Sequence, residues 1–238
     1  MLDEYEFVVF NDANNPRIKQ KVIDACNKHS VRCVNIPPEV HGSRQQPSER
    51  TSDSIQYSLD ILGFDHDGIV CILDSDMFLI KPFSFKNFLK DFDLMGVPQT
   101  RGHVNYLWNG LVIFKMNVLP NKRSIDFNCG WIEAQPTDTG GQTYYYLKNN
   151  PSLKIKYCPE TSSYWLPSTN EELKSLGFDN VTIDFIHLLK IDPASGMSFD
   201  GDNHFLHYYA GGNWNRKSED YHRNKTKMLN DYINKILN

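Results

Sequence analysis

The chain has 238 residues, enough for one full α/β domain and short for two, so we expect a single domain over residues 1–238. Apolar residues make up 40% of the chain and charged residues 23%, which is ordinary for a globular protein. The net charge of −4 argues against nucleic acid as the main partner, because phosphate backbones call for a clustered basic face.

The cysteines and the N-terminus bear on the compartment. The five cysteines show no Cys-x-x-Cys spacing, which favours reduced thiols and a cytoplasmic location. The acidic N-terminus is not followed by a long apolar stretch, so we expect neither a signal peptide nor a membrane span. The sequence therefore indicates a cytoplasmic enzyme or a domain of a longer polypeptide.

The N-terminal residues have the pattern of a strand, a polar loop and a helix. Residues 6–11 are predicted to form the strand, and the loop begins at Asn11 and Asp12. Pro16 suits the first position of a helix that follows an Asn cap, and helical spacing continues to about residue 29. This order is the opening of a nucleotide-binding βαβ unit.

Two arginines accompany the next helix. A short strand over residues 31–36 leads through a polar loop to a helix predicted over residues 48–62. Arg44 lies just before this helix and Arg50 lies on it. A guanidinium suits phosphate oxygens, so either could bind a diphosphate. The alternative for each is a solvated arginine on a helix surface.

The most informative stretch is Gly68 to Pro82. Residues 69–73 form a continuous apolar run, typical of a strand covered on both faces in a parallel sheet, and the run ends in Asp74-Ser75-Asp76. Two carboxylates at the C-terminal end of a buried strand cannot both stay ionised without a nearby cation. We therefore expect a divalent metal with open positions for substrate phosphates. The alternative is a turn in which the aspartates bond nearby backbone N–H groups.

This segment resembles the D-x-D region of nucleotide-sugar glycosyltransferases with a GT-A fold, in particular the glycogenin-like enzymes and their bacterial and viral relatives. The resemblance implies a Rossmann-like α/β domain with a mixed, mostly parallel central sheet flanked by helices. It also implies that Asp74 and Asp76, with Ser75 between them, hold Mn²⁺ or Mg²⁺ at the diphosphate of a donor such as UDP-glucose. Asn11 and Asp12 would meet the base or ribose of that donor.

Further along, a helix is predicted over residues 84–90, a strand over 93–98 and another over 107–115. Asn109 and Gly110 interrupt the last strand, and glycine within a strand marks a bulge or a close backbone approach. An Asn-Gly strand lines the sugar pocket in the resembled family, so these two residues are candidate donor-sugar contacts.

Asp138 and Gln142 are the candidate catalytic residues. They flank a Thr-Gly-Gly turn before an aromatic helix, at a place where the resembled family contacts the transferred sugar. If the enzyme inverts the anomeric centre, Asp138 is the first candidate for the base on the acceptor hydroxyl. Its alternative role is a helix cap.

The last motif surrounds His207. It resembles the late motif in which a histidine completes the metal shell and a glycine-rich loop wraps the diphosphate. The loop residues here are Gly211, Gly212, Asn213 and Trp214, and Arg216 or Lys217 would replace the missing Lys-Pro of that motif. His204 lies three positions earlier, so the two histidines face opposite ways on a strand and only one should reach the metal.

The remaining segments are structural. Residues 153–158 alternate as a strand, residues 168–172 show a capping box before a short helix, and residues 181–192 fit either a strand or a helix. Residues 218–237 are predicted to form an amphipathic C-terminal helix that packs on the domain.

The sequence therefore predicts a metal-dependent glycosyltransferase, a hexosyltransferase that uses a nucleotide-sugar donor, with UDP favoured by family habit. The predicted ion binds Asp74, Asp76 and His207 and acts as Lewis acid and template at the departing diphosphate. The alternatives are a haloacid-dehalogenase-like phosphatase and a non-catalytic carbohydrate-binding domain. The acceptor, the donor sugar and the stereochemical outcome do not follow from the sequence.

Overall fold

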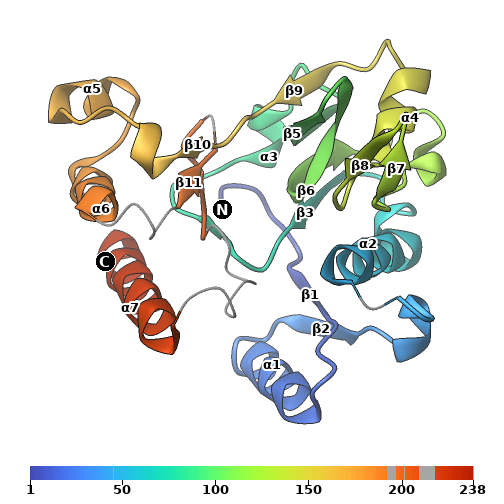
Figure 1. Ribbon diagram of the computed structural model, residues 1–238, viewed down its shortest axis with the longest axis horizontal. Coiled ribbons are helices and arrows are strands. Elements are labelled where there is room, and N and C mark those ends of the chain that lie inside the picture. Colours follow the sequence, from blue (N-terminus) through green and yellow to red (C-terminus); the bar gives the residue numbers. More distant parts are fainter. Residues whose placement is uncertain (45, 192–196, 201, 209–217, 238) are drawn as a thin grey trace. The chain divides into compact units, whose positions relative to one another are not determined.

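The computed structural model describes residues 1–44, 46–191, 197–200, 202–208 and 218–237 (Figure 1). The chain is mixed α/β and divides into two compact units. Unit 1 consists of Met1–Leu73 and Ser84–Tyr157, and unit 2 of Asp74–Phe83 and Cys158–Asn238. None of the helices in the described ranges is long and apolar enough to cross a bilayer. The single-domain assignment stays a prediction.

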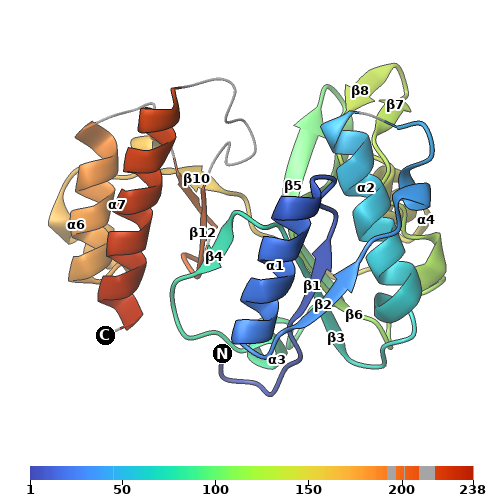
Figure 2. The same cartoon turned by 90° about the horizontal axis from the view of Figure 1, so that it is seen from below.

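Unit 1 begins with the predicted strand, loop and helix. Strand β1 (Val8–Asn11) pairs in parallel with β2 (Arg32–Asn35), and helix α1 (Pro16–Lys28) connects them and lies beside both (Figure 2). The Asn15 side chain accepts hydrogen bonds from the N–H groups of Arg17 and Ile18, at 2.9 and 3.3 Å. The predicted Asn cap is thus confirmed, with Pro16 at the first helical position.

The larger sheet of unit 1 has the order β3 (Ile69–Leu73), β6 (Val104–Lys115), β5 (Leu94–Arg101) and β9 (Ile155–Tyr157). The β3–β6 and β6–β5 pairs are antiparallel and only β5–β9 is parallel. The expectation of a mostly parallel sheet is therefore wrong. Among the described strands β3 pairs with β6 alone, and its residues are half-buried rather than covered on both faces. An unbroken apolar run shows that a strand has apolar neighbours, but not the direction of its partner.

Helices and a hairpin complete unit 1. They are α2 (Pro47–Ser58), which continues into a π-helical turn at Leu59–Gly63, α3 (Phe85–Phe88), α4 (Thr143–Asn149), and the antiparallel hairpin of β7 (Gly130–Ile132) and β8 (Gln135–Thr137). Single 3₁₀ turns occupy Pro38–His41 and Lys122–Ser124. The core of this unit gathers side chains from α2, β5, β6 and α4, including Leu94 and Phe114, together with Phe127 of the loop before β7.

Unit 2 contains an antiparallel sheet in the order β10 (Thr161–Ser162), β11 (Ser198–Phe199), β12 (Phe205–His207) and β4 (Met77–Leu79). Phe199, Leu206 and Phe78 lie opposite one another in one row and belong to the hydrophobic cluster of this unit. His207 lies in the adjacent row, between Ser198 and Met77, so its side chain points to the opposite face.

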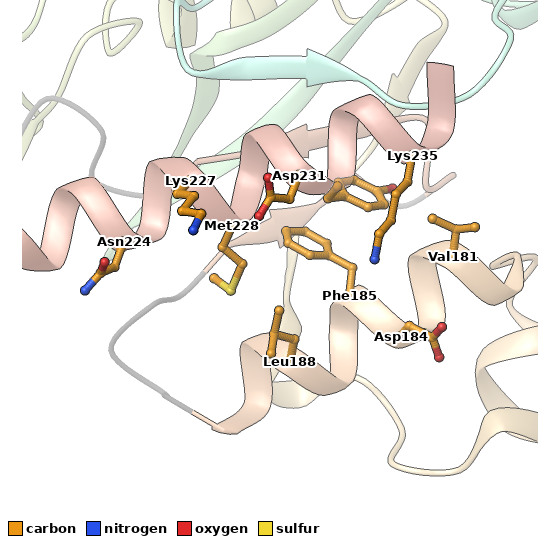
Figure 3. Close-up of a pocket in the computed structure, with 10 residues that line it drawn as sticks. Val181, Asp184, Phe185, Leu188, Asn224, Lys227, Met228, Asp231 and Lys235 are labelled. Carbon is orange, nitrogen blue, oxygen red and sulfur yellow. The ribbon is translucent and has the colours of Figure 1, made fainter. Parts of the chain in front are cut away.

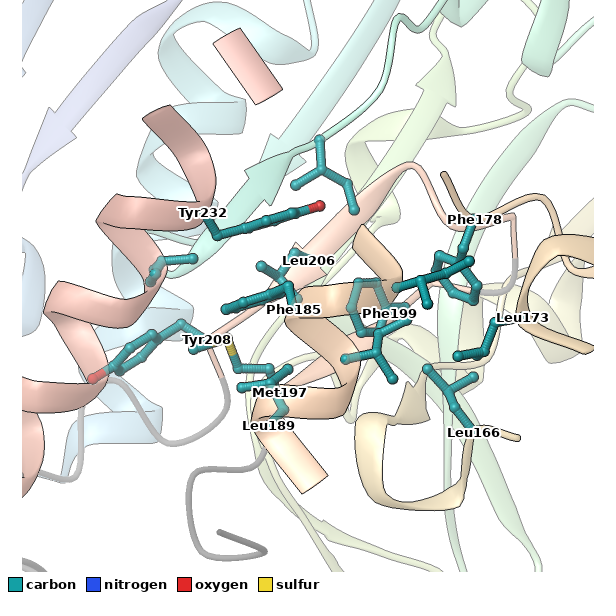
Figure 4. Packing of buried hydrophobic residues seen from close by; sticks show 14 residues of the cluster. Leu166, Leu173, Phe178, Phe185, Leu189, Met197, Phe199, Leu206, Tyr208 and Tyr232 are labelled. Carbon is teal, nitrogen blue, oxygen red and sulfur yellow. The ribbon is translucent and has the colours of Figure 1, made fainter. Parts of the chain in front are cut away.

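Three helices pack with this sheet: α5 (Asn170–Ser175), α6 (Asn180–Ile191) and α7 (Glu219–Leu237). Their apolar faces close the cluster shown in Figure 4, in which Phe185 stacks on Tyr232 with ring centroids 4.1 Å apart. The segment that fitted either a strand or a helix is thus helical, and the terminal amphipathic helix is confirmed. Thr169 caps α5 through the N–H of Glu172, as the capping box predicted. A 3₁₀ turn covers Ser163–Trp165.

Candidate functional site

The sheet of unit 2 brings Asp76 and His207 together. Strands β4 and β12 are antiparallel, His207 lies opposite Met77, and the backbone N–H of Tyr208 donates to the carbonyl of Asp76 at 2.8 Å. The Nε2 atom of His207 lies 3.6 Å from Oδ1 of Asp76. Asp76 and His207 are far apart in the sequence but are neighbours here because β4 pairs directly with β12.

The other nitrogen of His207 faces a residue that the sequence analysis missed. The Nδ1 atom lies 3.1 Å from both carboxylate oxygens of Glu160, close enough for a hydrogen bond. Glu160 directly precedes β10 and carries no motif of its own. The one available signal was an acidic residue at a strand start, which is too common in sequences to be informative.

The imidazole of His207 therefore lies between two carboxylates. Burial by itself lowers the pKa of His207, but the carboxylates of Asp76 and Glu160 outweigh it and raise the pKa to about 9. Atom Oδ1 of Asp76 and Oε1 of Glu160 are buried and accept no hydrogen bond from any described residue. Such atoms are costly to bury, so the arrangement suits a positive charge at this place.

The pair of Asp76 and His207 fits part of a divalent-metal site. A carboxylate oxygen and an imidazole nitrogen are both ligands for Mn²⁺, and Mg²⁺ accepts the carboxylate. Two donors about 2.1 Å from one octahedral ion lie about 3.0 Å apart at a right angle, so the observed 3.6 Å needs only a small closure. Within the described ranges, no group of three or more His, Cys, Asp or Glu side chains forms a metal centre. The pair would thus leave several coordination positions to water or substrate.

Asp74, the other predicted ligand, takes part in a turn. Its Oδ1 accepts a hydrogen bond from the N–H of Ser75 at 2.7 Å, and its carbonyl accepts one from the N–H of Met77 at 3.1 Å. Ser75 itself is exposed. These contacts are those of the turn that was the alternative role of Asp74, and they orient the chain into β4.

Of the other residues of the late motif, the structure describes His204 but not the glycine-rich loop. The ring of His204 packs edge-on against Phe83, at a centroid distance of 5.1 Å, so His207 is the histidine beside Asp76. The predicted loop residues Gly211, Gly212, Asn213 and Trp214, and the substitutes Arg216 and Lys217, lie outside the described residues.

Unit 1 holds a second polar group around Asp12. Asp12 accepts hydrogen bonds from Arg50 at 3.0 and 3.1 Å, and its Oδ1 lies 2.6 Å from Nε2 of the buried His41. The neighbouring Asn11 is buried and donates to the carbonyl of Lys19 and to Oδ1 of Asn35. Asn11 therefore ties β1 to α1 and β2, whereas the guanidinium of Arg50 orients Asp12.

Arg44 extends this polar group. Its guanidinium donates to Oδ1 of Asp53 and to Oδ1 of Asn128, both at 2.6 Å, and Asp53 also lies beside Nδ1 of His41. Next to these side chains is a hollow of about 210 Å³ lined by Asp12, Ala13, Asn14, Pro16, Lys19, Ile36 and Pro38. The hollow offers carboxylate, amide and ammonium groups within unit 1.

Asn109 and Gly110 lie in a bulge, as predicted. Trp108 pairs with Val97 and Val112 pairs with Gly96, so residues 109–111 have no partner on β5. A Cβ at position 110 would lie 1.9 and 2.0 Å from two atoms of the Trp108 ring, so any other residue would force that ring to shift. Asn109 is buried.

Asp138 and Gln142 flank a turn before α4. Asp138 is exposed; its Oδ1 accepts the N–H of Thr139 at 2.8 Å, and its own N–H donates to the hydroxyl of Tyr106. The N-terminal capping position of α4 is Gln142, so Asp138 does not cap that helix. A carboxylate held at one oxygen retains lone pairs for a substrate hydroxyl.

A separate hollow of about 370 Å³ lies between α6 and α7 of unit 2 (Figure 3). Phe185, Leu188 and Met228 contribute apolar surface, while Asp184, Asp231, Lys227 and Lys235 are also part of its lining. None of the site residues predicted from the sequence lines this hollow.

Comparison with known proteins identifies no relative. No family model matches the chain, and no curated protein or solved structure matches it. The functional conclusion therefore depends on the residues themselves.

Proposed function

We propose that this chain is a metal-dependent glycosyltransferase that moves a sugar from a nucleoside-diphosphate donor, of the UDP type, to an acceptor hydroxyl. The observation that carries the proposal is the buried Oδ1 of Asp76, which accepts no hydrogen bond within the described part of the chain and lies 3.6 Å from Nε2 of His207. The D-x-D resemblance supports the same conclusion from the sequence, and we assign the chain to a GT-A-like fold on that basis.

The metal-binding roles belong to unit 2. Asp76 and His207 would hold Mn²⁺ or Mg²⁺, with Asp74 as a further ligand after release of its hydrogen bond to Ser75. An ion bound there neutralises charge on a departing nucleoside diphosphate. The two protein donors leave coordination positions for two phosphate oxygens, which is the coordination pattern of Mg²⁺ and Mn²⁺ at phosphate-bearing substrates.

The nucleoside-binding role is proposed for the hollow of unit 1. Asp12 is the carboxylate that could accept hydrogen bonds from ribose hydroxyls, and Arg50 and His41 fix its orientation. Asp138 stays the candidate base, because it is exposed and held at only one oxygen by the described contacts. Gln142 stays a candidate contact of the transferred sugar.

The first experiment measures binding of a panel of nucleotide sugars with and without Mn²⁺, by calorimetry and thermal shift. We expect one UDP-sugar to bind only when Mn²⁺ is present. Asp76→Ala should weaken Mn²⁺ binding at least about 100-fold, since it removes one of two protein donors. Asp91→Ala, which removes an exposed carboxylate of unit 1, serves as the matched control. Equal Mn²⁺ affinity in the wild type and Asp76→Ala would refute the proposal.

The same proteins separate the alternatives. A phosphatase would hydrolyse p-nitrophenyl phosphate with Mg²⁺ and would not discriminate among nucleotide sugars. A carbohydrate-binding domain would bind oligosaccharides equally well before and after Asp76→Ala. Release of UDP from a UDP-sugar, lost in Asp76→Ala, supports the transferase over both.

A further inference from the structure

Glu160 makes a contact that has a chemical consequence for His207. A carboxylate only accepts hydrogen bonds, so the Nδ1 atom 3.1 Å away must carry the proton of that bond. When the imidazole is neutral, the lone pair is then on Nε2, the nitrogen that faces Oδ1 of Asp76. The carboxylate thus selects the tautomer whose Nε2 lone pair faces Asp76.

The backbone fixes Glu160 in this place. It directly precedes β10, in which Ser162 lies opposite Ser198, and Ser198 in turn lies opposite His207. Neighbouring strands are about 4.8 Å apart, so β10 and β12 are separated by roughly 10 Å across this row. The side chains of Glu160 and His207 extend toward each other and together span this distance. The Glu160 side chain is only 16% exposed.

The burial of Glu160 argues that its contact with His207 is not accidental. Oxygen Oε1 of Glu160 is buried and accepts no hydrogen bond from the residues that the structure describes, and a buried carboxylate is costly unless positive charge compensates it. A second positive charge beyond the imidazole would offset that cost. Histidines that bind metals commonly donate their other N–H to a carboxylate, which fixes the ring and strengthens the ligand.

We propose that Glu160 is a positioning residue that holds His207 with Nδ1 protonated and directs Nε2 to a divalent cation shared with Asp76. This inference rests on the metal site of the proposed function. It adds a residue that acts through His207 and does not itself touch the ion or the substrate.

The test compares Glu160→Ala and Glu160→Gln with the wild type. Glutamine keeps an acceptor for the Nδ1 proton but lacks the charge, whereas alanine removes both. We expect Mn²⁺ affinity, measured by the electron paramagnetic resonance of free Mn²⁺, to fall about 10- to 100-fold in Glu160→Ala and by less in Glu160→Gln. Glu171→Ala, at an exposed glutamate of α5, should bind Mn²⁺ as the wild type does.

A second measurement excludes a purely structural role. Long-range ¹H–¹⁵N spectra of histidine-labelled, Mg²⁺-loaded protein report which ring nitrogen carries the proton. We expect a single Nδ1–H form for His207 in the wild type and in Glu160→Gln, and a mixture of tautomers in Glu160→Ala. Circular dichroism confirms that each variant is folded.

The outcomes distinguish a failure of the Glu160 role from a failure of the proposed function. If Asp76→Ala abolishes Mn²⁺ binding while Glu160→Ala leaves affinity and tautomer unchanged, the role of Glu160 is refuted and the proposed function stands. If the wild type binds no Mn²⁺ through Asp76, both proposals are refuted. Graded losses in the order wild type, glutamine, alanine support both.

Discussion

Tyr232 in α7 allows the packing of unit 2 to be tested quantitatively. Its ring is 2% exposed and stacks on Phe185, and its hydroxyl lies 3.0 Å from Oγ1 of the buried Thr182. Burial raises the pKa of Tyr232 to about 12, although the hydrogen bond with Thr182 acts in the opposite direction. The pKa of an unfolded tyrosine is about 10.

The direction in which pH changes the stability follows from proton binding. Between pH 10 and 12 the unfolded chain loses the Tyr232 proton while the folded chain keeps it, so stability is full below pH 10 and falls as pH rises through 12. A difference of about 2 pKa units corresponds to roughly 2.7 kcal/mol in all, of which about 2 kcal/mol is lost by pH 11.5.

Tyr232→Phe removes both the hydrogen bond with Thr182 and the loss of stability at alkaline pH. At pH 8 it should cost about 1 kcal/mol, because the buried Thr182 hydroxyl loses its partner. At pH 11.5 the variant lacks the alkaline loss and should be about 1 kcal/mol more stable than the wild type. Urea unfolding at the two pH values measures this reversal, with Tyr164→Phe, at an exposed tyrosine, as the control. If the wild type and Tyr232→Phe show parallel pH profiles, the hydroxyl is not buried as described and the reasoning fails.

Two further substitutions probe unit 1, and a titration probes the thiols. Gly140→Ala should destabilise the chain by about 3 kcal/mol or more in thermal unfolding, because the added Cβ would lie 2.0 Å from the carbonyl oxygen of Leu107. Gly177→Ala is the control: this glycine also has a positive φ but faces open space, so the substitution should cost only about 1 kcal/mol in the same assay. Arg50→Ala should cost about 1–2 kcal/mol in urea unfolding, since it leaves the partly buried Asp12 with less compensation, and an equal loss in the exposed variant Arg17→Ala would contradict this. The unfolded chain should titrate as five thiols without reductant, because none of the five cysteines forms a disulfide in the structure, and a lower count would reveal one.

Local signals in the sequence predicted local structure well. The caps at Asn15 and Thr169 were predictable because each is satisfied by N–H groups two or three residues away. The bulge at Asn109 and Gly110 was predictable because a glycine in an apolar strand has few other uses. In each case the decisive partners lie nearby in the sequence.

Partners distant in the sequence were harder to predict. The apolar run of β3 gave no indication that its neighbour β6 is antiparallel, because the same side chains suit either direction. Glu160 could not be found at all, since its meaning depends on His207 in another strand. The pairing of Asp76 with His207 was expected only through the resemblance to a known family.

Strand β4 has a consequence for how the molecule is made. Met77 pairs with His207, about 130 positions later in the chain. A ribosome that adds 5–20 residues per second needs roughly 7–26 seconds to reach that partner. During this interval the edge of β4 stays open to wrong pairing, and a polypeptide that terminates before residue 207 lacks the strand partner of Met77. The proposed ion site of Asp76 and His207 therefore cannot form until residue 207 has been synthesised.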